Sequence, residues 1–299
     1  MKKTAIIVLN YNDADTTRHF VMELVQMTNL DFIVIVDNAS TDDSWGRLQY
    51  LEALDERVDL LRARKNGGYG SGNQLGINYA VDRLGADYVI VANPDVHITE
   101  ECVEAVRAAL DKTKRGAIAS AMVHDIEGRE TLSYWSLLPF WKDLLDTGLV
   151  TRRLFRRLLK APLSSLPQGG TQNCRIVDAL AGSFFMLRVD RFADGQVHKL
   201  FDPQIFLYYE EKVLGEKLRQ MNRRAVLVTD ASYVHAHSVS IDKSVRSIGD
   251  KQAILHQSKL YYYRRYLKAG PIKMAAARIF LGIVLAEVRF LTQVCHLRW

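Results

Sequence analysis

The segment from Val89 to Val96 joins a strand-like apolar run to a single carboxylate. The β-branched and small apolar residues before Asn93 predict a buried strand. Pro94 ends that strand, because proline cannot donate to a sheet ladder. Asp95 follows at the carboxyl end of the strand, which is the edge of an α/β sheet where ligands bind. A carboxylate there suits Mg²⁺ or Mn²⁺ shared with a diphosphate. The alternative is a turn aspartate that caps the next helix.

Three further loops follow predicted strands and carry groups suited to a nucleotide. Asn10 and Asn12 follow the first strand, and Asp37 closes the second, where a carboxylate can accept hydrogen bonds from a base or a ribose. The third loop opens a helix and is rich in glycine, so its backbone can approach an anion at the helix N-terminus. It runs from Lys65 to Asn73 and contains Asn66, Gly67 and Gly70. Its glycines have the spacing of neither a P-loop nor a dinucleotide-binding fingerprint. This argues against a P-loop ATPase and against a dehydrogenase. An ordinary tight turn is the alternative.

These loops need a scaffold, and the first 115 residues alternate strand-like and helix-like patterns. We expect strands at 4–9, 31–37, 58–62 and 86–92, and helices at 14–28, 70–84 and 99–112, with Thr99 as the N-cap of the last. This alternation predicts an α/β fold with a mostly parallel central sheet covered by helices on both faces.

The rhythm changes after residue 115. We expect strands at 116–123, 176–189 (broken at 181–183), 225–228 and 233–237, a loop at 162–170, and helices at 137–160 (interrupted by Pro139), 205–221, 250–269 and 271–299. The predicted organisation is one domain over residues 1–245, with a nucleotide-binding half (1–115) and a catalytic, acceptor-binding half (116–245). Residues 246–299 would form a helical C-terminal extension.

The composition sets wide limits on function. The 299 residues carry 40 Lys and Arg against 34 Asp and Glu, a net charge of +6 that suits anionic partners without selecting one. The three cysteines form no CxxC pair, so we expect neither a zinc knuckle nor a disulfide framework, and a reducing, cytoplasmic setting. The N-terminal apolar run is too short for a signal peptide, and the longest one near the C-terminus, 279–286, is too short to span a bilayer.

Together the motifs resemble family 2 glycosyltransferases of the GT-A fold, and within them the bacterial rhamnosyltransferase-like subgroup. Those that carry the resemblance are Ile6–Asn12 (IIVLNYN), Val36–Asp42 (VDNASTD), Asn66–Gly70 (NGGYG) and Asn93–Val96 (NPDV). Members of this subgroup often have NPDV where other glycosyltransferases have DXD. A second block, Gly182–Arg188 with Phe201-Asp202 and Tyr208–Glu211, is similar to the acceptor-side half of the family and extends the match to about residue 240.

The resemblance implies a role for each of these groups. Asp37 would hold the base or the ribose, and the donor pocket would be completed by Asn10, Asn12, Asn66, Gly67, Gly70, Asn73 and Asn93. Asp95 would bind a divalent metal ion, Mg²⁺ or Mn²⁺, that bridges the donor diphosphate. Glu211 would be the catalytic base, with Glu210 as the alternative. Inverting transfer does need a carboxylate that takes the proton of the acceptor hydroxyl.

The family pattern also breaks in this chain. Members often carry an Asp shortly after the paired acids, but Val213 stands there. In the family, a histidine near the end of this half often completes the metal site or contacts the diphosphate. His235 matches that pattern best, and His237 is the alternative, because residues two apart on a strand share a face.

The implied activity is metal-dependent, inverting transfer of a sugar from a nucleotide-diphosphate donor. The expected donor is dTDP-rhamnose, or else a UDP-hexose, and the expected acceptor is a bacterial cell-surface polysaccharide or a lipid-linked glycan. The basic, aromatic C-terminal helices and the basic run 151–160 fit peripheral contact with the inner face of the cell membrane, with packing or a homo-oligomer interface as the alternative. No motif predicts nucleic-acid binding.

Two rival functions stay open at this point. A nucleotidyltransferase would carry a glycine-rich basic loop directly after the first strand, which this chain lacks. A non-catalytic nucleotide-sugar-binding or scaffold protein has the missing acid at Val213 as its support.

Overall fold

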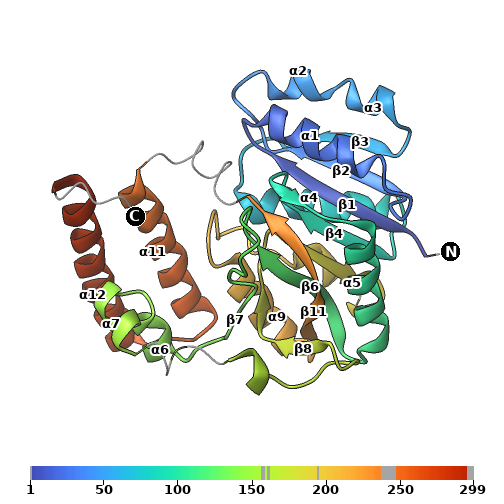
Figure 1. Ribbon diagram of the computed structural model, residues 1–299. Coiled ribbons are helices and arrows are strands. Elements are labelled where there is room, and N and C mark those ends of the chain that lie inside the picture. Colours follow the sequence, from blue (N-terminus) through green and yellow to red (C-terminus); the bar gives the residue numbers. More distant parts are fainter. Residues whose placement is uncertain (1, 156–158, 160–161, 194, 237–246, 295–299) are drawn as a thin grey trace.

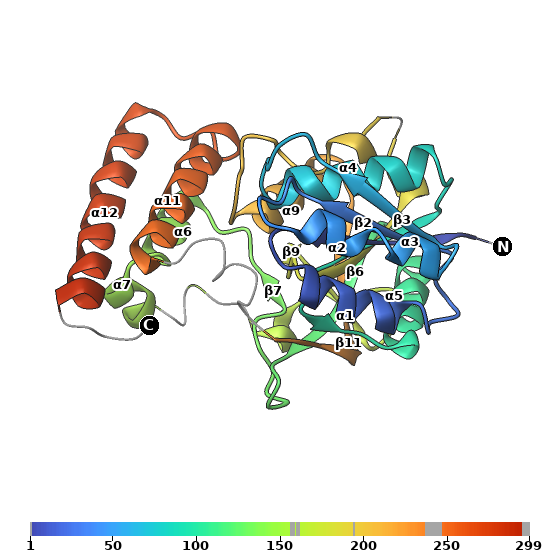
Figure 2. The same ribbon diagram turned by 90° about the horizontal axis from the view of Figure 1, so that it is seen from above.

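A computed structural model describes residues 2–155, 159, 162–193, 195–236 and 247–294 (Figure 1). A twisted sheet runs through the larger part of the molecule, and a group of helices lies beside it (Figures 1 and 2). The strands of the large sheet are β1 (Thr4–Asn10), β2 (Phe32–Asp37), β3 (Val58–Arg62), β4 (Tyr88–Ala92), β5 (Val96–His97), β6 (Gly116–His124), β8 (Cys174–Val177), β10 (Phe184–Arg188) and β11 (Arg224–His235).

The sheet is parallel in its first half and mixed in its second. Its order is β3-β2-β1-β4-β10-β6-β11-β5, with β8 paired to β11. The four strands β1 to β4 are parallel, whereas β10 inserts antiparallel between β4 and β6. The α/β class with a largely parallel first half is therefore confirmed, and the carboxyl ends of β1, β2 and β4 meet at one edge.

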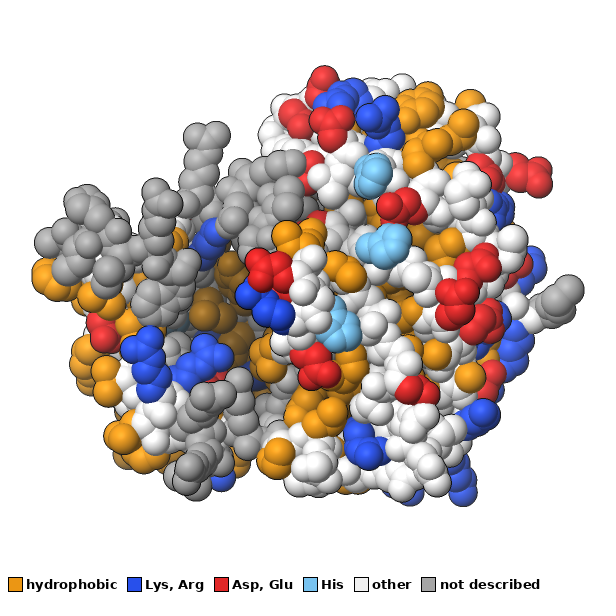
Figure 3. Space-filling model, viewed as in Figure 1, with side chains coloured by type: hydrophobic (Ala, Val, Ile, Leu, Met, Phe, Trp, Pro, Cys, Tyr) orange, Lys and Arg blue, Asp and Glu red, His pale blue; other side chains and the backbone are white. Residues whose placement is uncertain are grey.

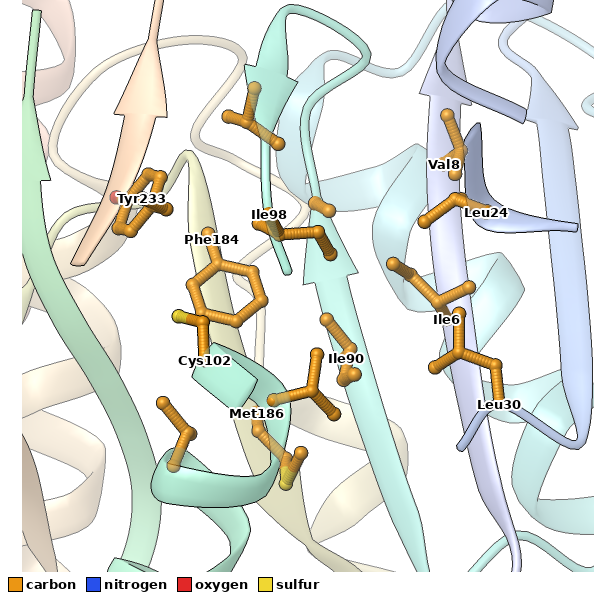
Figure 4. Packing of buried hydrophobic residues seen from close by; sticks show 14 of the residues in the cluster. Ile6, Val8, Leu24, Leu30, Ile90, Ile98, Cys102, Phe184, Met186 and Tyr233 are labelled. Atoms are coloured by element: carbon orange, nitrogen blue, oxygen red, sulfur yellow. The ribbon is translucent and has the colours of Figure 1, made fainter. Parts of the chain in front are cut away.

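Helices cover both faces of this sheet. They are α1 (Ala14–Leu24), α2 (Ser44–Leu48), α3 (Leu51–Leu54), α4 (Tyr69–Asp82), α5 (Glu100–Lys112) and α9 (Glu210–Gln220). One apolar layer contains Ile6, Leu24, Ile90 and Phe184, and Figure 4 shows these side chains interleaving between the strands and the helices on that face. The opposite layer packs α4 and α9 against the other face of the sheet. Two buried layers hold the strand ends rigidly, which is what a site at that edge requires.

A separate helical group lies beside the sheet. It contains α6 (Phe140–Leu145), α7 (Leu149–Leu154), α11 (Ile248–Arg265) and α12 (Pro271–Arg289), which continues as a short π-helix, Phe290–Val294. Its own apolar cluster joins α6, α11 and α12 to the segment that precedes α9. The helical group therefore also draws on residues 140–154, while the predicted boundary at 245 stays a prediction.

Several expected elements need correction. The strands expected at 225–228 and 233–237 form one strand, β11, whose register shifts between Val228 and Ser232 absorb the polar residues between them. The helix expected from residue 205 begins only at Glu210, because Tyr208 and Tyr209 have left-handed φ values of 68° and 74°. Short elements such as α2, α3 and β5 are missed because they span too few residues to show a period.

Candidate active site

The side chains of Asp95 and His235 meet at the carboxyl end of β4. Asp95 lies in the turn between β4 and β5, and β5 pairs with the end of β11, so that Val96 stands opposite His235. The backbone N–H of Ala236 donates to the Asp95 carbonyl over 3.0 Å. This pairing places His235 Nε2 3.3 Å from Asp95 Oδ1, with 14% and 5% of the two side chains exposed.

The capping alternative for Asp95 is wrong. Thr99 caps α5 instead, and its Oγ1 accepts the N–H of Cys102 at 3.2 Å, as predicted. Asp95 Oδ1 is buried and accepts no hydrogen bond from the described residues. A buried carboxylate oxygen without a donor is costly unless a cation or a ligand satisfies it.

The pair fits a divalent ion that is shared with a ligand. The described residues contain no cluster of three or more His, Cys, Asp or Glu side chains able to hold a metal. Asp95 and His235 would supply two positions, and the remaining ones would be left for phosphate oxygens and water, as Mg²⁺ and Mn²⁺ sites often are. The second predicted histidine, His237, lies outside the described residues.

A tight turn between β9 (Ala179–Leu180) and β10 connects this pair to the paired glutamates. The Ser183 carbonyl accepts the backbone N–H of Asn93 at 2.8 Å. The neighbouring Gly182 carbonyl accepts the Tyr69 hydroxyl at 2.6 Å. A Cβ at Gly182 would stand 2.9 Å from Glu211 Oε1, so only glycine leaves room for the carboxylate. The turn thus brings the Asn93 loop, Tyr69 and Glu211 together.

Glu210 and Glu211 open α9 in different environments. Glu210 is 5% exposed, and its buried Oε1 has no hydrogen-bond partner among the described residues. Burial, and then the charge of Glu211, raises the pKa of Glu210 well above its usual value. Burial also raises the pKa of Glu211, while hydrogen bonds from its own backbone and that of Gly182 oppose the rise. As a whole residue Glu211 is half-buried and thus less enclosed than Glu210.

Tyr69 lies within electrostatic reach of both parts of the site. Burial raises the pKa of its hydroxyl well above the usual value, and the charges of Glu211, Glu210 and Asp95 raise it further. Glu210, Glu211, Tyr69 and Gly182 also line one small cavity. Tyr69 is a site residue that was not predicted from the sequence, although it stands within the glycine-rich loop. The sequence feature that could have indicated Tyr69 is a single aromatic residue among glycines.

Asn10 and Asp37 are bonded to each other at the ends of β1 and β2. Asn10 Nδ2 donates to Asp37 Oδ2 at 2.9 Å and to Ser40 Oγ at 3.1 Å, and the Ser40 backbone N–H donates to Asp37 Oδ1 at 3.0 Å. Both side chains are fully buried. Their direct contact with a donor stays a prediction, since these polar atoms already hold the 38–42 loop in place.

Asn12 and Asn66 also order backbone at this edge. Asn12 has a left-handed φ of 53°, and its Oδ1 accepts the N–H of Thr41 at 2.8 Å. Asn66 Oδ1 accepts the Gly68 N–H at 2.9 Å and the Asn38 side chain at 3.0 Å. Asn38, which the sequence analysis left without a role, therefore ties the second loop to the glycine-rich loop.

The glycine-rich loop is packed more tightly by protein than expected. A Cβ at Gly70 would meet Phe201 at 2.9 Å, and one at Gly67 would meet Ser71 at 2.5 Å. Asn73 is fully buried, with its Nδ2 donating to the Tyr69 carbonyl at 3.1 Å and its Oδ1 unpaired among the described residues. Gly70 thus has an ordinary packing reason to be glycine, and donor binding by Gly67, Gly70 and Asn73 stays a prediction.

A buried ionic cluster behind α9 was missed by the sequence analysis. The Asp143 carboxylate is fully buried and contacts Lys212 and Lys259, and its Oδ1 accepts the hydroxyls of Tyr209 at 2.6 Å and Tyr263 at 2.9 Å. The four partners come from α11 and from the start of α9, so no sequence spacing reveals them. The cluster fixes the left-handed residues that lead into Glu210.

The break in the family pattern at Val213 has a packing explanation. Val213 is 1% exposed and belongs to the apolar cluster of the helical group, together with Ile205 and Leu281. An acid at this position would be buried without a partner, whereas the neighbouring Lys212 has Asp143. Val213 is therefore explained by the packing of α12 near α9, and its presence does not support the alternative of a non-catalytic protein.

The arrangement is a parallel sheet edge with a metal-competent pair, nucleotide-type loops and a carboxylate beyond them, which is the layout of a nucleotide-sugar-dependent transferase. Residues 5–161, more than half of the chain, match the family model described as "Glycosyl transferase family 2". The chain belongs to this family.

Two curated relatives are similar to this chain in sequence. One is the "Low-salt glycan biosynthesis hexosyltransferase Agl10" of Haloferax volcanii, 26% identical over 219 residues that cover 73% of this chain and 62% of the relative. The other is the "N-acetylglucosaminyl-diphospho-decaprenol L-rhamnosyltransferase" of Mycobacterium tuberculosis, 27% identical over 264 residues that cover 79% of this chain and 78% of the relative. The chain thus spans less than two thirds of the length of the Haloferax protein.

Solved structures share the fold. GalNAc-T7 with UDP, GalNAc and Mn²⁺ gives a TM-score of 0.57 at 14% identity, over 88% of this chain and 50% of that one. The mannosyltransferase PcManGT from Pyrobaculum calidifontis with GDP-Man and Mn²⁺ also gives 0.57 at 14% identity, over 95% and 70% of the two chains. At such identities the likeness shows the GT-A fold alone, which confirms the predicted fold class.

Proposed function

We propose that this protein transfers a sugar, with inversion and with the help of a divalent metal, from a nucleotide-diphosphate donor to a glycan acceptor. The observation that carries the proposal is the contact of Asp95 with His235, in which the buried Asp95 Oδ1 accepts no hydrogen bond from the part of the chain that the structure describes. That contact lies at the sheet edge where α/β folds bind ligands. Membership of glycosyl transferase family 2 supports the same reaction.

Asp95 and His235 would hold Mg²⁺ or Mn²⁺ at this edge. The bound ion would neutralise the diphosphate as it leaves. The two structural neighbours named above contain Mn²⁺, which makes a divalent ion the expected cofactor without choosing between the two metals. The loops at Asn12, Asp37 and Asn66 would line the donor, with Asn10, Gly67, Gly70, Asn73 and Asn93 completing or supporting that pocket.

Glu211 would accept the proton of the acceptor hydroxyl. Its raised pKa and the hydrogen bond from the Gly182 backbone suit a general base. Glu210 is the weaker candidate, because it is the more buried residue of the two and its Oε1 has no hydrogen-bond partner among the described residues. Tyr69, held by Gly182, would border the same reaction space.

The donor would be dTDP-rhamnose, or else a UDP-hexose, and the acceptor a lipid-linked glycan or a cell-surface polysaccharide. The mycobacterial relative is named as a rhamnosyltransferase that acts on a diphospho-decaprenol-linked sugar, and the Haloferax relative as a hexosyltransferase. None of the described helices is long and apolar enough to cross a membrane. For an acceptor carried on a lipid, we propose that the protein works at the cytoplasmic face of the membrane as a peripheral enzyme.

A donor screen with an inactive metal-site variant tests this function. Nucleoside diphosphates and their sugars, each with and without Mn²⁺ or Mg²⁺, are ranked by the rise they cause in the thermal midpoint, because a ligand of the native state stabilises it by mass action. One nucleotide should stabilise the protein only with metal, and Asp95→Asn should abolish that response. If every nucleotide acts equally with and without metal, or if Asp95→Asn responds as the wild type does, the proposal is wrong.

A further inference from the structure

Helix α12 is apolar on both of its long faces. Its inner face packs against the helical group with Met274, Ala277, Leu281, Val284 and Val288. Its outer face exposes Ile272 by 85%, Ile279 by 67%, Ile283 by 62% and, directly after its last residue, Phe290 by 56%. The spacing of seven, four and seven residues places these side chains along one stripe. A helix of a globular protein normally covers its outer face with polar residues, so this face is built to be covered.

Two short helices extend the same surface. Trp141 on α6 is 52% exposed, and Val150 and Leu154 on α7 are 67% and 73% exposed. The start of α7 adjoins α12, since a Cβ at Gly148 would stand 2.9 Å from Phe280. Figures 1 and 2 both show α7 beside α12. We call the exposed apolar side chains of α6, α7 and α12, with the Phe290 that follows, the outer helical surface.

The outer helical surface is bordered by positive charge. Its three helices carry six exposed cations, Lys142, Arg152, Arg153, Lys273, Arg278 and Arg289. The same helices carry two acids, and of these Asp143 is buried and Glu287 is half-buried. In Figure 3 orange apolar side chains lie along this part of the molecule beside blue Lys and Arg side chains. The positive charge of this surface suits an anionic partner and disfavours a cationic one.

We infer that the outer helical surface docks on an anionic lipid bilayer. An interfacial helix lays its apolar face into the boundary between headgroups and acyl chains while cations on its flanks contact lipid phosphates. The apolar stripe suits the boundary between headgroups and acyl chains, and the cations beside it suit the lipid phosphates. A second copy of the chain fits less well, because a twofold contact would bring this positive surface against itself.

Docking would also set the position of the paired glutamates. The inner face of α12 packs in one cluster with Ile205, Tyr209 and Val213, which flank the start of α9. A membrane-bound α12 would therefore hold that start at a fixed depth relative to the lipid. This last step rests on the proposed function, since it matters for an acceptor carried on a lipid; the docking itself does not.

Vesicle co-sedimentation of the full chain tests the docking without any need for turnover. The protein is spun with vesicles of phosphatidylcholine alone and with vesicles that also contain phosphatidylglycerol, at low and at high salt. We expect binding to the anionic vesicles that weakens as salt screens the charges. Ile279→Asp with Ile283→Asp should lower the partition coefficient by ~10-fold or more, because burial of these side chains drives insertion.

The matched control is Ile126→Asp, which changes an equally apolar side chain, 77% exposed, in the turn after β6. It should bind like the wild type, and circular dichroism should show all variants folded. Arg153→Glu with Arg278→Glu should weaken binding to anionic vesicles while leaving the apolar stripe intact. The inference is overturned if the wild type ignores anionic vesicles or if the double isoleucine variant binds them fully. It is also overturned if light scattering shows a dimer that this variant splits and that does not bind vesicles.

Discussion

Lys259 of α11 and Asp143 of α6 form a buried ion pair within the helical group, with Nζ 3.2 Å from Oδ1, and Asp143 also contacts Lys212 near the start of α9. Burial opposes ionisation of Asp143, but the charges of Lys259 and Lys212 hold its pKa below the usual value. Burial lowers the pKa of Lys259 to about 8, although Asp143 opposes that shift. At neutral pH the lysine is therefore still charged, and the pair is intact.

Lys259→Met should destabilise the protein strongly, because it leaves Asp143 buried with one cationic partner fewer. Breaking a buried pair from one side costs ~3–5 kcal/mol, and the remaining Lys212 should keep the loss near the lower end. Urea unfolding measures the change. Arg47→Met, which removes the exposed pair with Asp15, is the control and should have no measurable effect. Equal losses in the two variants would contradict a structural role for the cluster.

Glu211→Gln and Glu210→Gln should separate the two acids kinetically. If Glu211 is the base, its amide should lower turnover by ~10²–10⁴-fold while donor binding stays intact. Glu210→Gln should retain most of the activity, since its carboxylate is buried. Single-turnover rates and donor affinities measured on both variants check this. The reverse ranking would assign the base to Glu210.

The pH dependence of stability should reveal Glu210. Its pKa is raised in the folded protein, so its proton is bound more tightly there than in the unfolded chain, and stability is lost as pH rises from the usual range of a glutamate to the raised pKa. Glu210→Gln mimics the neutral form. In acid, the variant should be as stable as the wild type. As pH rises from the usual range of a glutamate to the raised pKa, the variant should become more stable than the wild type, by up to ~1.4 kcal/mol per pH unit. Unfolding curves at several pH values measure the gain, and a constant difference at all pH values would rule it out.

Gly68→Ala should destabilise the glycine-rich loop. Gly68 has a φ of 85°, and a Cβ there would overlap the Phe206 carbonyl oxygen, so the loss should exceed ~1 kcal/mol. Gly46→Ala in α2 is the control, because no neighbouring atom of the described residues lies within 4 Å of a Cβ placed there, and alanine favours a helix. Thermal midpoints should move in opposite directions. A tolerated alanine at position 68 would mean that the loop shifts freely.

The sequence by itself determined the α/β class and the order of the first strands, because strand and helix periods can be read from neighbouring residues. It also determined that Asp95 would stand at a strand end, since the apolar run and the proline are adjacent in the chain. Thr99 was recognisable as a cap for the same local reason.

Only the tertiary structure decided which side chains meet. The contact of Asp95 with His235 depends on β5 pairing with β11, and the surroundings of Glu211 depend on a turn near Gly182. The same holds for the helical group, in which Asp143 meets lysines about 70 and 116 residues away. These relationships arise from long-range packing, which leaves no period in the sequence. The chain alone could therefore name Asp95 and Glu211, but it could not show how they are supported.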